Sequence, residues 1–308
     1  MKLQQLRYAL EVYRHNLNVS EAADALFTSQ PGISKQIRLL EEELGIQIFI
    51  RSGKRVVSVS QPGKAVLEIS ERILRDVQNI KNIGSEFTDH DSGSLTIATT
   101  HTQARYALPK IVAEFVKNYP KVNLTIKQGS PSAIAQMVSS GEADLAIITE
   151  RIDDHPELGK LPCYEWNHAV IVPHDHPLLD CRNPLSLEDL ASFPLVTYEF
   201  AFNSGSSIAR TFNKAHIEQP DVALSAADTD VLKTYVRLGL GVGLMAKMAY
   251  DPAVDQDLQL IDAAHLFEPS PTWIALRSDT YLRGYTYDFI QMFAPKLTRE
   301  AVDRILYT

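Results

Sequence analysis

Residues 22–45 read AADALFTSQPGISKQIRLLEEELG, and this stretch decides the fold of the N-terminal part of the chain. Its first residues are small and apolar and suit a short helix, whereas the run Thr28–Gly32 breaks the helical pattern. A second helix, from about Pro31 to Leu44, ends at Gly45 and keeps its apolar residues on one face. Two helices joined by a tight turn predict a helix-turn-helix.

The opposite face of the second helix, with its N-terminal end, is polar and basic. Serine and glutamine are short enough to reach base edges, and lysine and arginine can reach phosphate or guanine. Two apolar runs, 48–51 and 56–59, then flank Ser52–Arg55 and predict a hairpin wing with a basic tip. The predicted DNA contacts are Ser29, Gln30, Pro31, Ser34, Lys35, Arg38, Arg51, Lys54 and Arg55. By pattern alone, a small helical packing unit with a solvated charged face is an equal alternative.

Charge is distributed unevenly along the 308 residues. The net charge is −8, which taken alone argues against a nucleic-acid binder. Residues 1–60 nevertheless hold eight bases and six acids, a net charge of +2, so the remaining residues carry −10. A mildly basic module on an acidic body fits a DNA-binding domain joined to something else. The length also suits at least two folding units.

The composition is that of an ordinary globular protein, with 45% hydrophobic and 22% charged residues. No apolar run has the length of a membrane span or forms a signal peptide. Two cysteines make no disulfide framework. We therefore expect a cytoplasmic protein with no membrane partner.

A long helical pattern begins at Gln61, and its apolar residues are spaced three and four apart. They are Val66, Ile69, Ile73, Val77, Ile80, Ile83 and Phe87. A rod of this length has no core of its own on which to bury such a seam, so we expect a homodimer through this helix. The alternative is a helix packed on the body of the same chain. The polar stretch Thr88–Gly93 is the predicted hinge.

From Ser94 onwards strands alternate with helices, which predicts parallel sheets. The expected strands lie at 95–99, 122–127, 144–148, 169–172, 195–198, 242–246 and 273–277. A chain that leaves one sheet near Pro162 and returns to it near Phe267 forms two subdomains with two crossings. The expected fold class is α+β, with an N-terminal winged helix-turn-helix and linker helix before an α/β effector domain of two subdomains, like a periplasmic binding protein. The expected domains are 1–60 for DNA binding, 61–92 for the linker, and 93–308 for the effector domain, with subdomain I over 93–163 and 267–308 and subdomain II over 164–266.

Polar residues follow the carboxyl ends of several of these strands, where open parallel sheets bind ligands. The stretches are 99–103, 128–130, 149–150 and, in the second subdomain, 202–206. Hydroxyl and amide side chains beside helix N-termini build a site for a small anionic or amino-acid-like ligand without a full positive charge. For any one of these residues helix capping is the simpler explanation, but their convergence favours a ligand.

The stretch from Ala22 to Gly45, with Phe49 and Arg51, resembles the winged helix-turn-helix of LysR-type transcriptional regulators. The match is dense and nearly free of gaps, and it decides against the simple packing unit. The rest of the chain is similar to the CysB subfamily, whose members regulate sulfur-assimilation genes. The segments that carry this likeness are 99–109, 128–131, 161–167, 228–243 and 287–295. The resemblance covers essentially the whole chain.

The resemblance implies a regulator, not an enzyme, that binds double-stranded promoter DNA as a dimer or tetramer, contacts RNA polymerase and needs no cofactor. The implied effector is O-acetylserine or N-acetylserine, opposed by sulfate or thiosulfate, and a Cbl-like regulator of sulfonate use is the alternative. Together with the strand ends, the predicted effector contacts are Thr100, His101, Thr102, Gln103, Gly129, Ser130, Thr149, Trp166 and Asn203. Asn203 departs from the subfamily, which has a threonine followed by Gly-Arg-Ser there.

Other chemistry finds little support in the sequence. The run Gly239–Gly243 lacks the strand before it and the phosphate lysine of a nucleotide loop, so we expect its glycines to allow close backbone approach. His174 and His176 have no third ligand nearby, and no metal site is expected. Cys163 is expected to be a packed thiol, with a thiol sensor as the alternative. The alternative of another class is a stand-alone solute-binding protein. Such a protein has no use for a winged helix and would need an export signal, so the sequence argues against it.

Overall fold

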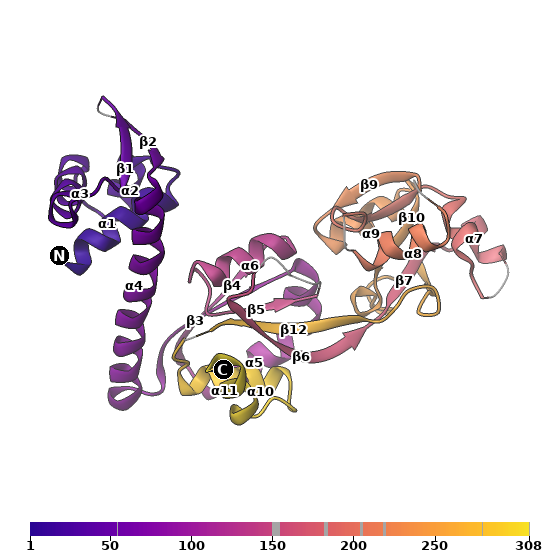
Figure 1. Ribbon diagram of the computed structural model, residues 1–308. Coiled ribbons are helices and arrows are strands. Elements are labelled where there is room, and N and C mark those ends of the chain that lie inside the picture. The colour runs from indigo at the N-terminus through magenta and orange to yellow at the C-terminus, as the bar shows by residue number, and fades with distance from the viewer. Residues whose placement is uncertain are drawn as a thin grey trace. The chain divides into compact units, whose positions relative to one another are not determined.

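The computed structural model describes residues 1–307 except 54, 150–154, 182–183, 204–205, 218–219 and 279 (Figure 1). The chain divides into two compact units, Met1–Thr88 and Asp89–Thr308. Four residues of the predicted sites and ligand stretches lie outside the described residues: Lys54, Glu150, Ser204 and Gly205. Within the described ranges, no helix has both the length and the apolar character that crossing a bilayer requires.

The first unit is a winged helix-turn-helix followed by a long helix. It contains α1 (Leu3–Arg14), α2 (Val19–Ala25), α3 (Gln30–Leu44), β1 (Phe49–Ser52), β2 (Arg55–Val59) and α4 (Gln61–Thr88). The Asn18 side chain accepts hydrogen bonds from two backbone N–H groups of α2, and the Ser29 hydroxyl accepts one from Gly32 N–H at the start of α3. Gly45 ends α3 with a φ of 66°, a left-handed conformation that favours glycine. The predicted fold of this part is confirmed.

Helices α2 and α3 bury their apolar faces in the core of this unit. Ile33, Ile37 and Leu40 of α3 are buried with the small residues Ala22 and Ala23 of α2. Strands β1 and β2 pair antiparallel, as a hairpin requires. The polar face of α3 is left outward because its apolar residues recur at the helical period.

Helix α4 has 28 residues and a length of about 42 Å at 1.5 Å per residue. Its first turns pack on the core of the unit, where Leu67 and Ser70 are buried. Farther along the helix the predicted seam is exposed, with Ile80 at 68% and Phe87 at 85%. Within the described residues of its own unit, that part of the seam is therefore uncovered, and its pairing with a second copy stays a prediction.

The second unit contains two five-stranded sheets, each with its own helices. The sheet of subdomain I has the order β4-β3-β5-β12-β6 and consists of β3 (Ser92–Thr99), β4 (Lys121–Gln128), β5 (Leu145–Ile148), β6 (Leu158–Trp166) and β12 (Ser270–Arg277). Helix α6 (Pro131–Ser139) packs on one face. The other face is covered by α5 (Pro109–Asn118), α10 (Gly284–Phe293) and α11 (Arg299–Leu306), as Figure 1 shows. A π-helical turn, η1 (Gln103–Ala107), follows β3.

The sheet of subdomain II has the order β11-β7-β10-β8-β9. Its strands are β7 (His168–Pro173), β8 (Leu195–Tyr198), β9 (Val222–Ala226), β10 (Val242–Ala246) and β11 (Leu258–Asp262). Its helical elements are η2 (Pro177–Asp180), α7 (Leu187–Ala191), α8 (Ser207–Lys214), α9 (Thr229–Arg237) and η3 (Lys247–Ala249). The central strands β7, β8 and β10 are buried almost throughout, as expected for strands covered on both faces. The expected fold class, with its two-subdomain α/β part, is confirmed.

Both sheets are mixed, so the prediction of parallel sheets is wrong for part of each. β3 runs parallel to β4 and β5, and β8 runs parallel to β9 and β10. β12 pairs antiparallel with β5 and β6, and β7 pairs antiparallel with β10 and β11. A helical crossover makes neighbouring strands parallel, whereas β6 leads from subdomain I to subdomain II and β12 leads back, so these two strands run in opposite directions. β6 and β7 follow one another in different sheets with only Asn167 between them. The first crossing thus lies beyond Pro162, and the second, at 263–269, includes Phe267.

The glycines at 239–243 allow close backbone approach, as predicted. Gly239 has a φ of 76°, and a Cβ on Gly241 would lie 2.2 Å from the carbonyl oxygen of Pro194. A Cβ on Gly243 would lie 2.4 Å from the Ile171 side chain. The run leads from α9 into β10, a helix followed by a strand, which is the reverse of the order in a nucleotide loop.

Two glycines of α4 provide a matched test of packing against helix propensity. A Cβ on Gly63 would lie 2.2 Å from the carbonyl oxygen of Ile48, whereas a Cβ on Gly84 meets nothing within 4 Å. We expect Gly63→Ala to lower the free energy of unfolding by about 1–3 kcal/mol, because backbone must move. Gly84→Ala should raise it by up to about 1 kcal/mol. Thermal unfolding followed by circular dichroism measures both, and equal effects would contradict the close approach at Gly63.

Candidate functional site

The predicted DNA contacts on α3 lie at its N-terminal end and along its outer face. Ser29, Gln30 and Pro31 are exposed, and so are Lys35 and Arg38. The Ser29 hydroxyl is engaged in capping the helix. The Gln30 side-chain amide donates to the hydroxyl of Ser34 at 3.1 Å, which orders two polar side chains on one surface. The structure thus gathers the predicted residues of α3 on one face, and their contact with DNA stays a prediction.

The predicted contacts in the wing have different surroundings. Arg55 is exposed at the start of β2. Arg51 is half-buried, and its guanidinium donates to the carboxylate of Glu41 at 3.4 Å. The same carboxylate accepts hydrogen bonds from the backbone N–H groups of Ile48 and Phe49, so Arg51 belongs to a network that attaches the wing to α3. Lys54, at the tip, lies outside the described residues.

Phe27 is an exposed aromatic residue that the sequence pattern does not single out. It lies between α2 and α3, with 97% of its surface exposed and a φ of 49°. A positive φ is unusual for a bulky residue and reflects the tight turn of the motif. The turn is held by hydrogen bonds from the N–H groups of Phe27 and Thr28 to the carbonyl groups of Asp24 and Ala23.

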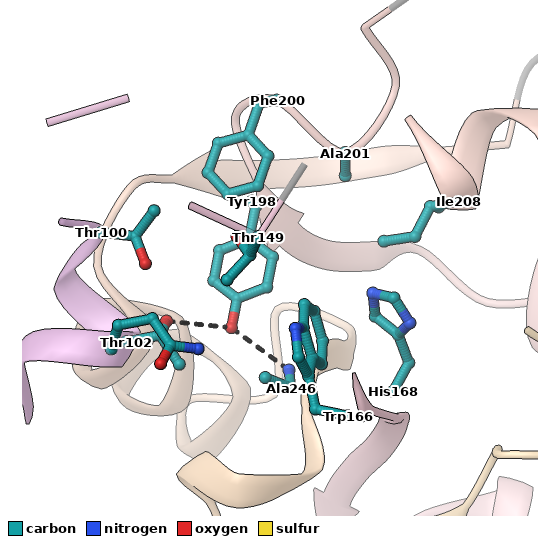
Figure 2. A pocket seen from close by; sticks show the side chains of 11 residues that line it. Thr100, Thr102, Thr149, Trp166, His168, Tyr198, Phe200, Ala201, Ile208 and Ala246 are labelled. Atoms are coloured by element: carbon teal, nitrogen blue, oxygen red, sulfur yellow. Dashed lines mark hydrogen bonds between the residues drawn. The ribbon is translucent and has the colours of Figure 1, made fainter. Parts of the chain in front are cut away.

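In the second unit a pocket lies between the two subdomains (Figure 2). The lining residues from subdomain I and the crossing are Thr100, Thr102, Gln103, Thr149 and Trp166, and those from subdomain II are His168, Tyr198, Phe200, Ala201, Ile208 and Ala246. The cavity volume is about 20 Å³, which holds about one water molecule. Five of the nine predicted effector contacts, Trp166 among them, therefore line one pocket. The other wall is aromatic and apolar, which corrects the expectation of a crevice lined mainly by hydroxyl groups.

Hydroxyl groups join the two subdomains at this pocket. The Thr102 hydroxyl lies 2.8 Å from the hydroxyl of Thr229 and 3.4 Å from that of Tyr198. The Tyr198 hydroxyl also lies 3.1 Å from Thr229 and accepts the backbone N–H of Ala246 at 3.2 Å (Figure 2). A hydroxyl both donates and accepts, so the three groups can exchange their present partners for those of a ligand.

Gln103 has an orientation that its neighbours determine. It is 1% exposed and lies in the π-helical turn η1. Its side-chain oxygen accepts the Tyr164 hydroxyl at 2.5 Å, and its amide nitrogen lies 3.9 Å from the sulfur of Met248. π-Helical turns are frequent at functional sites, where they redirect a side chain.

Four predicted effector contacts are absent from the lining of this pocket. Gly129 donates its N–H to the carbonyl of Thr99. Ser130 caps α6, which is the simpler explanation given for such residues in the sequence. Asn203 is exposed, and its backbone N–H donates to Phe200. His101 faces α9 instead. Contacts from these residues to an effector stay a prediction.

Charged groups from the two subdomains meet beside the pocket. His101 Nε2 lies 2.9 Å from the carboxylate of Asp228, close enough for an ion pair but not in hydrogen-bond geometry. Arg105 contacts Asp230, which also accepts the Tyr106 hydroxyl at 2.6 Å. Burial, followed by the hydrogen bond to Asp230, raises the pKa of Tyr106. These contacts hold η1 against the start of α9.

His101, Asp228 and Asp230 place three potential metal ligands within 4.8 Å of one another. No metal is predicted there from the sequence, and the contacts of Asp230 favour that expectation. Its carboxylate is already engaged by the Arg105 guanidinium and the Tyr106 hydroxyl. A cation would have to compete with this arginine, so the group is explained as an ion-pair network.

Cys163 is a half-buried thiol in β6. Its sulfur donates to the carbonyl of Leu161 at 3.5 Å, and burial raises the pKa of the thiol to about 12. A reactive cysteine needs a lowered pKa, because the thiolate is the reacting form. The structure therefore favours the packed thiol over the thiol sensor.

His168 is a lining residue that the sequence does not reveal. It is 3% exposed, its Nδ1 atom has no hydrogen-bond partner among the described residues, and the same holds for Nε1 of Trp166. Burial lowers the pKa of His168 to about 4, so the imidazole is neutral at neutral pH. A single histidine at the start of a strand carries no signal of burial in the sequence. The rings of Trp166 and Phe267 pack against His168, and Phe267 is about a hundred residues away along the chain.

The lowered pKa of His168 predicts a pH dependence of stability. Between pH 6.5 and 4 the unfolded state binds a proton that the folded state excludes, so the free energy of unfolding falls as the pH falls through this range. A shift from 6.5 to about 4 corresponds to a loss on the order of 3 kcal/mol. We expect His168→Asn to flatten this slope in urea unfolding followed by tryptophan fluorescence. Both tryptophans, Trp166 and Trp273, report on the second unit.

His174 is the matched control for this experiment. Its ring is exposed, and hydrogen bonds to the carbonyl of Gln256 and to Gln259 raise its pKa. His174→Asn should leave the loss of stability toward acidic pH in place. If the two variants changed the slope equally, burial of His168 would not be its cause.

Two family models match the sequence over nearly its whole length. Residues 3–64 match the bacterial regulatory helix-turn-helix protein, lysR family, and residues 88–298 match the LysR substrate binding domain. These two ranges contain the predicted DNA-binding surface and the pocket, respectively.

Three curated relatives align over almost the full chain. SsuR of Burkholderia cenocepacia is 50% identical over 306 residues, which are 99% of each chain. CysB of Haemophilus influenzae is 52% identical over 304 residues, 99% of this chain and 93% of the relative. The cbl protein of Escherichia coli is 43% identical over 304 residues, 99% and 96% of the two chains. Each is named as a transcriptional regulator, and none as an enzyme.

Two solved structures resemble the chain. The cofactor-binding domain of the Cbl transcriptional regulator is 39% identical, with a TM-score of 0.65, and covers 70% of this chain and 95% of its own. Full-length CbnR, solved in complex with its target DNA, is 19% identical and shares the fold, with a TM-score of 0.59 and coverage of 95% and 99%. With both family models and full-length relatives above 40% identity, the chain belongs to the LysR family of transcriptional regulators.

Proposed function

We propose that this LysR-family regulator controls sulfur-assimilation or cysteine-biosynthesis genes and responds to O-acetylserine or N-acetylserine, with sulfate or thiosulfate as opposing anions. The observation that carries the proposal is the pocket between the subdomains, whose polar side offers hydroxyl and amide groups without a formally charged side chain. Such a site suits a small anionic or zwitterionic ligand that hydrogen-bonds to neutral groups. The names of the CysB and SsuR relatives support a role close to sulfur metabolism.

The DNA-binding part of the proposal rests on the outer face of α3 and on the wing. Lys35, Arg38 and Arg55 are exposed there, in a region whose net charge is positive although the whole chain is acidic. Helix-turn-helix proteins insert the N-terminal part of their second helix into the major groove. The complex of CbnR with its target DNA supports the same use of this unit. Ser29, Gln30, Pro31 and Ser34 complete the proposed surface of α3, and Arg51 that of the wing.

We expect the protein to act as a homodimer or tetramer. Several apolar residues of the α4 seam are exposed in the single chain, including Ile69, Ile80 and Phe87. A second copy of α4 would bury this seam, because its apolar residues recur every three or four positions. The two winged helix-turn-helix regions of the dimer would then reach two half-sites of one promoter. The chain is also expected to contact RNA polymerase when it activates transcription.

Closure of the two subdomains is the proposed switch. The cavity volume of about 20 Å³ is too small for an acetylserine, so the subdomains must separate for the ligand to enter. A ligand shifts this equilibrium only if it binds one state more tightly than the other. A changed angle between the subdomains would alter the arrangement of subunits and the bend of the bound DNA.

A Cbl-like regulator of sulfonate use is the second candidate. The E. coli cbl protein is 43% identical over the same length, and the cofactor-binding domain of Cbl shares the fold of the second unit at 39% identity. The presence of Asn203 where the CysB subfamily has threonine leaves room for a different effector. Calorimetry with acetylserines, sulfate, thiosulfate and adenosine phosphosulfate distinguishes the two candidates.

Arg38→Ala tests the proposed DNA surface. We expect binding to a sulfur-assimilation promoter fragment to weaken about tenfold, because a base or phosphate contact is lost. Fluorescence anisotropy at several salt concentrations measures this, and the affinity for N-acetylserine should not change. Arg72→Ala, an exposed arginine of α4 outside the surface, is the control. Equal losses in the two variants would show that the loss is not specific to α3.

Thr100→Val tests the proposed effector site. The variant keeps the shape of a buried side chain and removes its hydroxyl, so we expect the affinity for N-acetylserine to fall about tenfold in calorimetry. Promoter affinity without effector should stay the same. Thr96→Val, on the same strand but away from the pocket lining, is the matched control. Unchanged binding in the Thr100 variant would remove this residue from the site.

A further inference from the structure

We infer that Trp166 and His168 form a neutral polar subsite that binds the carbonyl oxygen of an uncharged acyl group on the effector. This inference rests on the proposed function, because it assigns a part of the same effector. It makes His168 a specificity-determining residue that distinguishes acyl-bearing effectors from bare anions.

The first observation is a pair of buried polar atoms that lack partners. Trp166 Nε1 and His168 Nδ1 are inaccessible to solvent, and neither has a hydrogen-bond partner among the described residues. Buried polar atoms are nearly always hydrogen-bonded, since an unpaired one costs about 1–3 kcal/mol. Both residues line the pocket, and we assign the missing partner of these atoms to a ligand.

The second observation is that these two atoms belong to adjacent rings. The centroids of the Trp166 and His168 rings lie 4.7 Å apart, with an angle of 54° between their planes. In Figure 2, Thr100 and Thr102 lie on one side of the pocket, and His168 and Ile208 lie on the other. A ligand that reaches both sides therefore needs two different polar ends.

The chemistry of the two rings selects the group that they can bind. The indole N–H only donates, so its partner must offer an acceptor. A neutral imidazole with its proton on Nδ1 donates as well, and a carbonyl oxygen accepts two hydrogen bonds through its two lone pairs. Burial lowers the pKa of His168 to about 4, so the ring brings no positive charge to an anion at neutral pH.

The neighbouring side chains favour an acyl group over a charged one. Ala201 and Ile208 line the pocket on the same subdomain as His168, and both are buried. A carboxylate or sulfate placed there would lose its hydration without gaining a cation, which is unfavourable. An acyl group can place its oxygen at the two N–H groups and its alkyl part against these apolar side chains. The anionic end of the effector is left to the hydroxyl side of the pocket.

Calorimetry on the full chain with two probes tests the inference. N-acetylserine carries an acyl group, and sulfate does not. His168→Leu removes both ring nitrogens, and we expect it to weaken N-acetylserine about tenfold while the affinity for sulfate stays within about twofold. His168→Asn retains a polar nitrogen near the position of Nδ1 and should recover most of the affinity for N-acetylserine.

Trp166→Phe supplies an independent variant, because it removes the indole N–H and keeps an aromatic ring. It should lower the affinity for N-acetylserine relative to sulfate in the same direction. If His168→Leu does not fold, as judged by its thermal transition, Trp166→Phe and His168→Asn decide the question. A merely structural role of His168 would change both affinities together and leave their ratio constant.

The possible failures are distinguishable. If the wild-type chain binds neither probe, the proposed effectors are wrong, and the inference falls with them. If the wild type binds both probes and the variants leave the ratio of affinities unchanged, only the inference is overturned. The two ring nitrogens would then serve an ordered water and not an effector.

Discussion

The hydrogen bond between the hydroxyl groups of Thr102 and Thr229 is the contact on which the pocket depends. At 2.8 Å it joins the turn after β3 to the start of α9, and thus one subdomain to the other. Tyr198 extends the contact into β10 through Ala246. All three groups are uncharged, so the cost of separating them is modest compared with that of a buried ion pair. A weak closure of this kind is what a ligand of ordinary affinity can shift.

The charged contacts between the subdomains lie beside this hydroxyl cluster and leave the pocket neutral. Arg105 and Tyr106 engage Asp230 across the two subdomains, and within subdomain II Lys233 pairs with Asp255 at 2.7 Å. The Lys233–Asp255 pair is almost fully buried, which makes α9 a rigid support for the contact. Ion pairs thus lie beside the pocket, and uncharged hydrogen bonds lie where a ligand must enter.

The N-terminal fold could be predicted from sequence because each of its signals is local. Ser29 as a cap, Gly45 as a helix end and the spacing of Ile33 and Ile37 depend on residues a few positions apart. The polar strand ends gave Thr100, Thr102, Gln103 and Thr149 for the same reason. Strand β6 escapes such a pattern, because Pro162 interrupts it and its partners are more than a hundred residues away in β12.

The aromatic side of the pocket could not be predicted. Tyr198, Phe200 and Ile208 come from subdomain II, and they reach the pocket only through the pairing of β8 with β10 and the placement of α8. The same is true of His168, whose burial depends on Phe267 in the second crossing. Residues that end strands carry a local signal in the sequence, whereas residues that tertiary packing brings to the same place carry none. Ser130 shows the converse, since its position after a strand reflects a helix cap.

Asn167 is the single residue between β6 and β7, so one of the two covalent links between the subdomains has almost no slack. Trp166 and His168 lie on either side of it, one at the end of a strand in each sheet. Any twist of this link therefore changes the separation and tilt of the two rings. The relative position of the two rings therefore depends on the angle between the subdomains. The binding energy of a molecule that contacts both rings would depend on that angle as well.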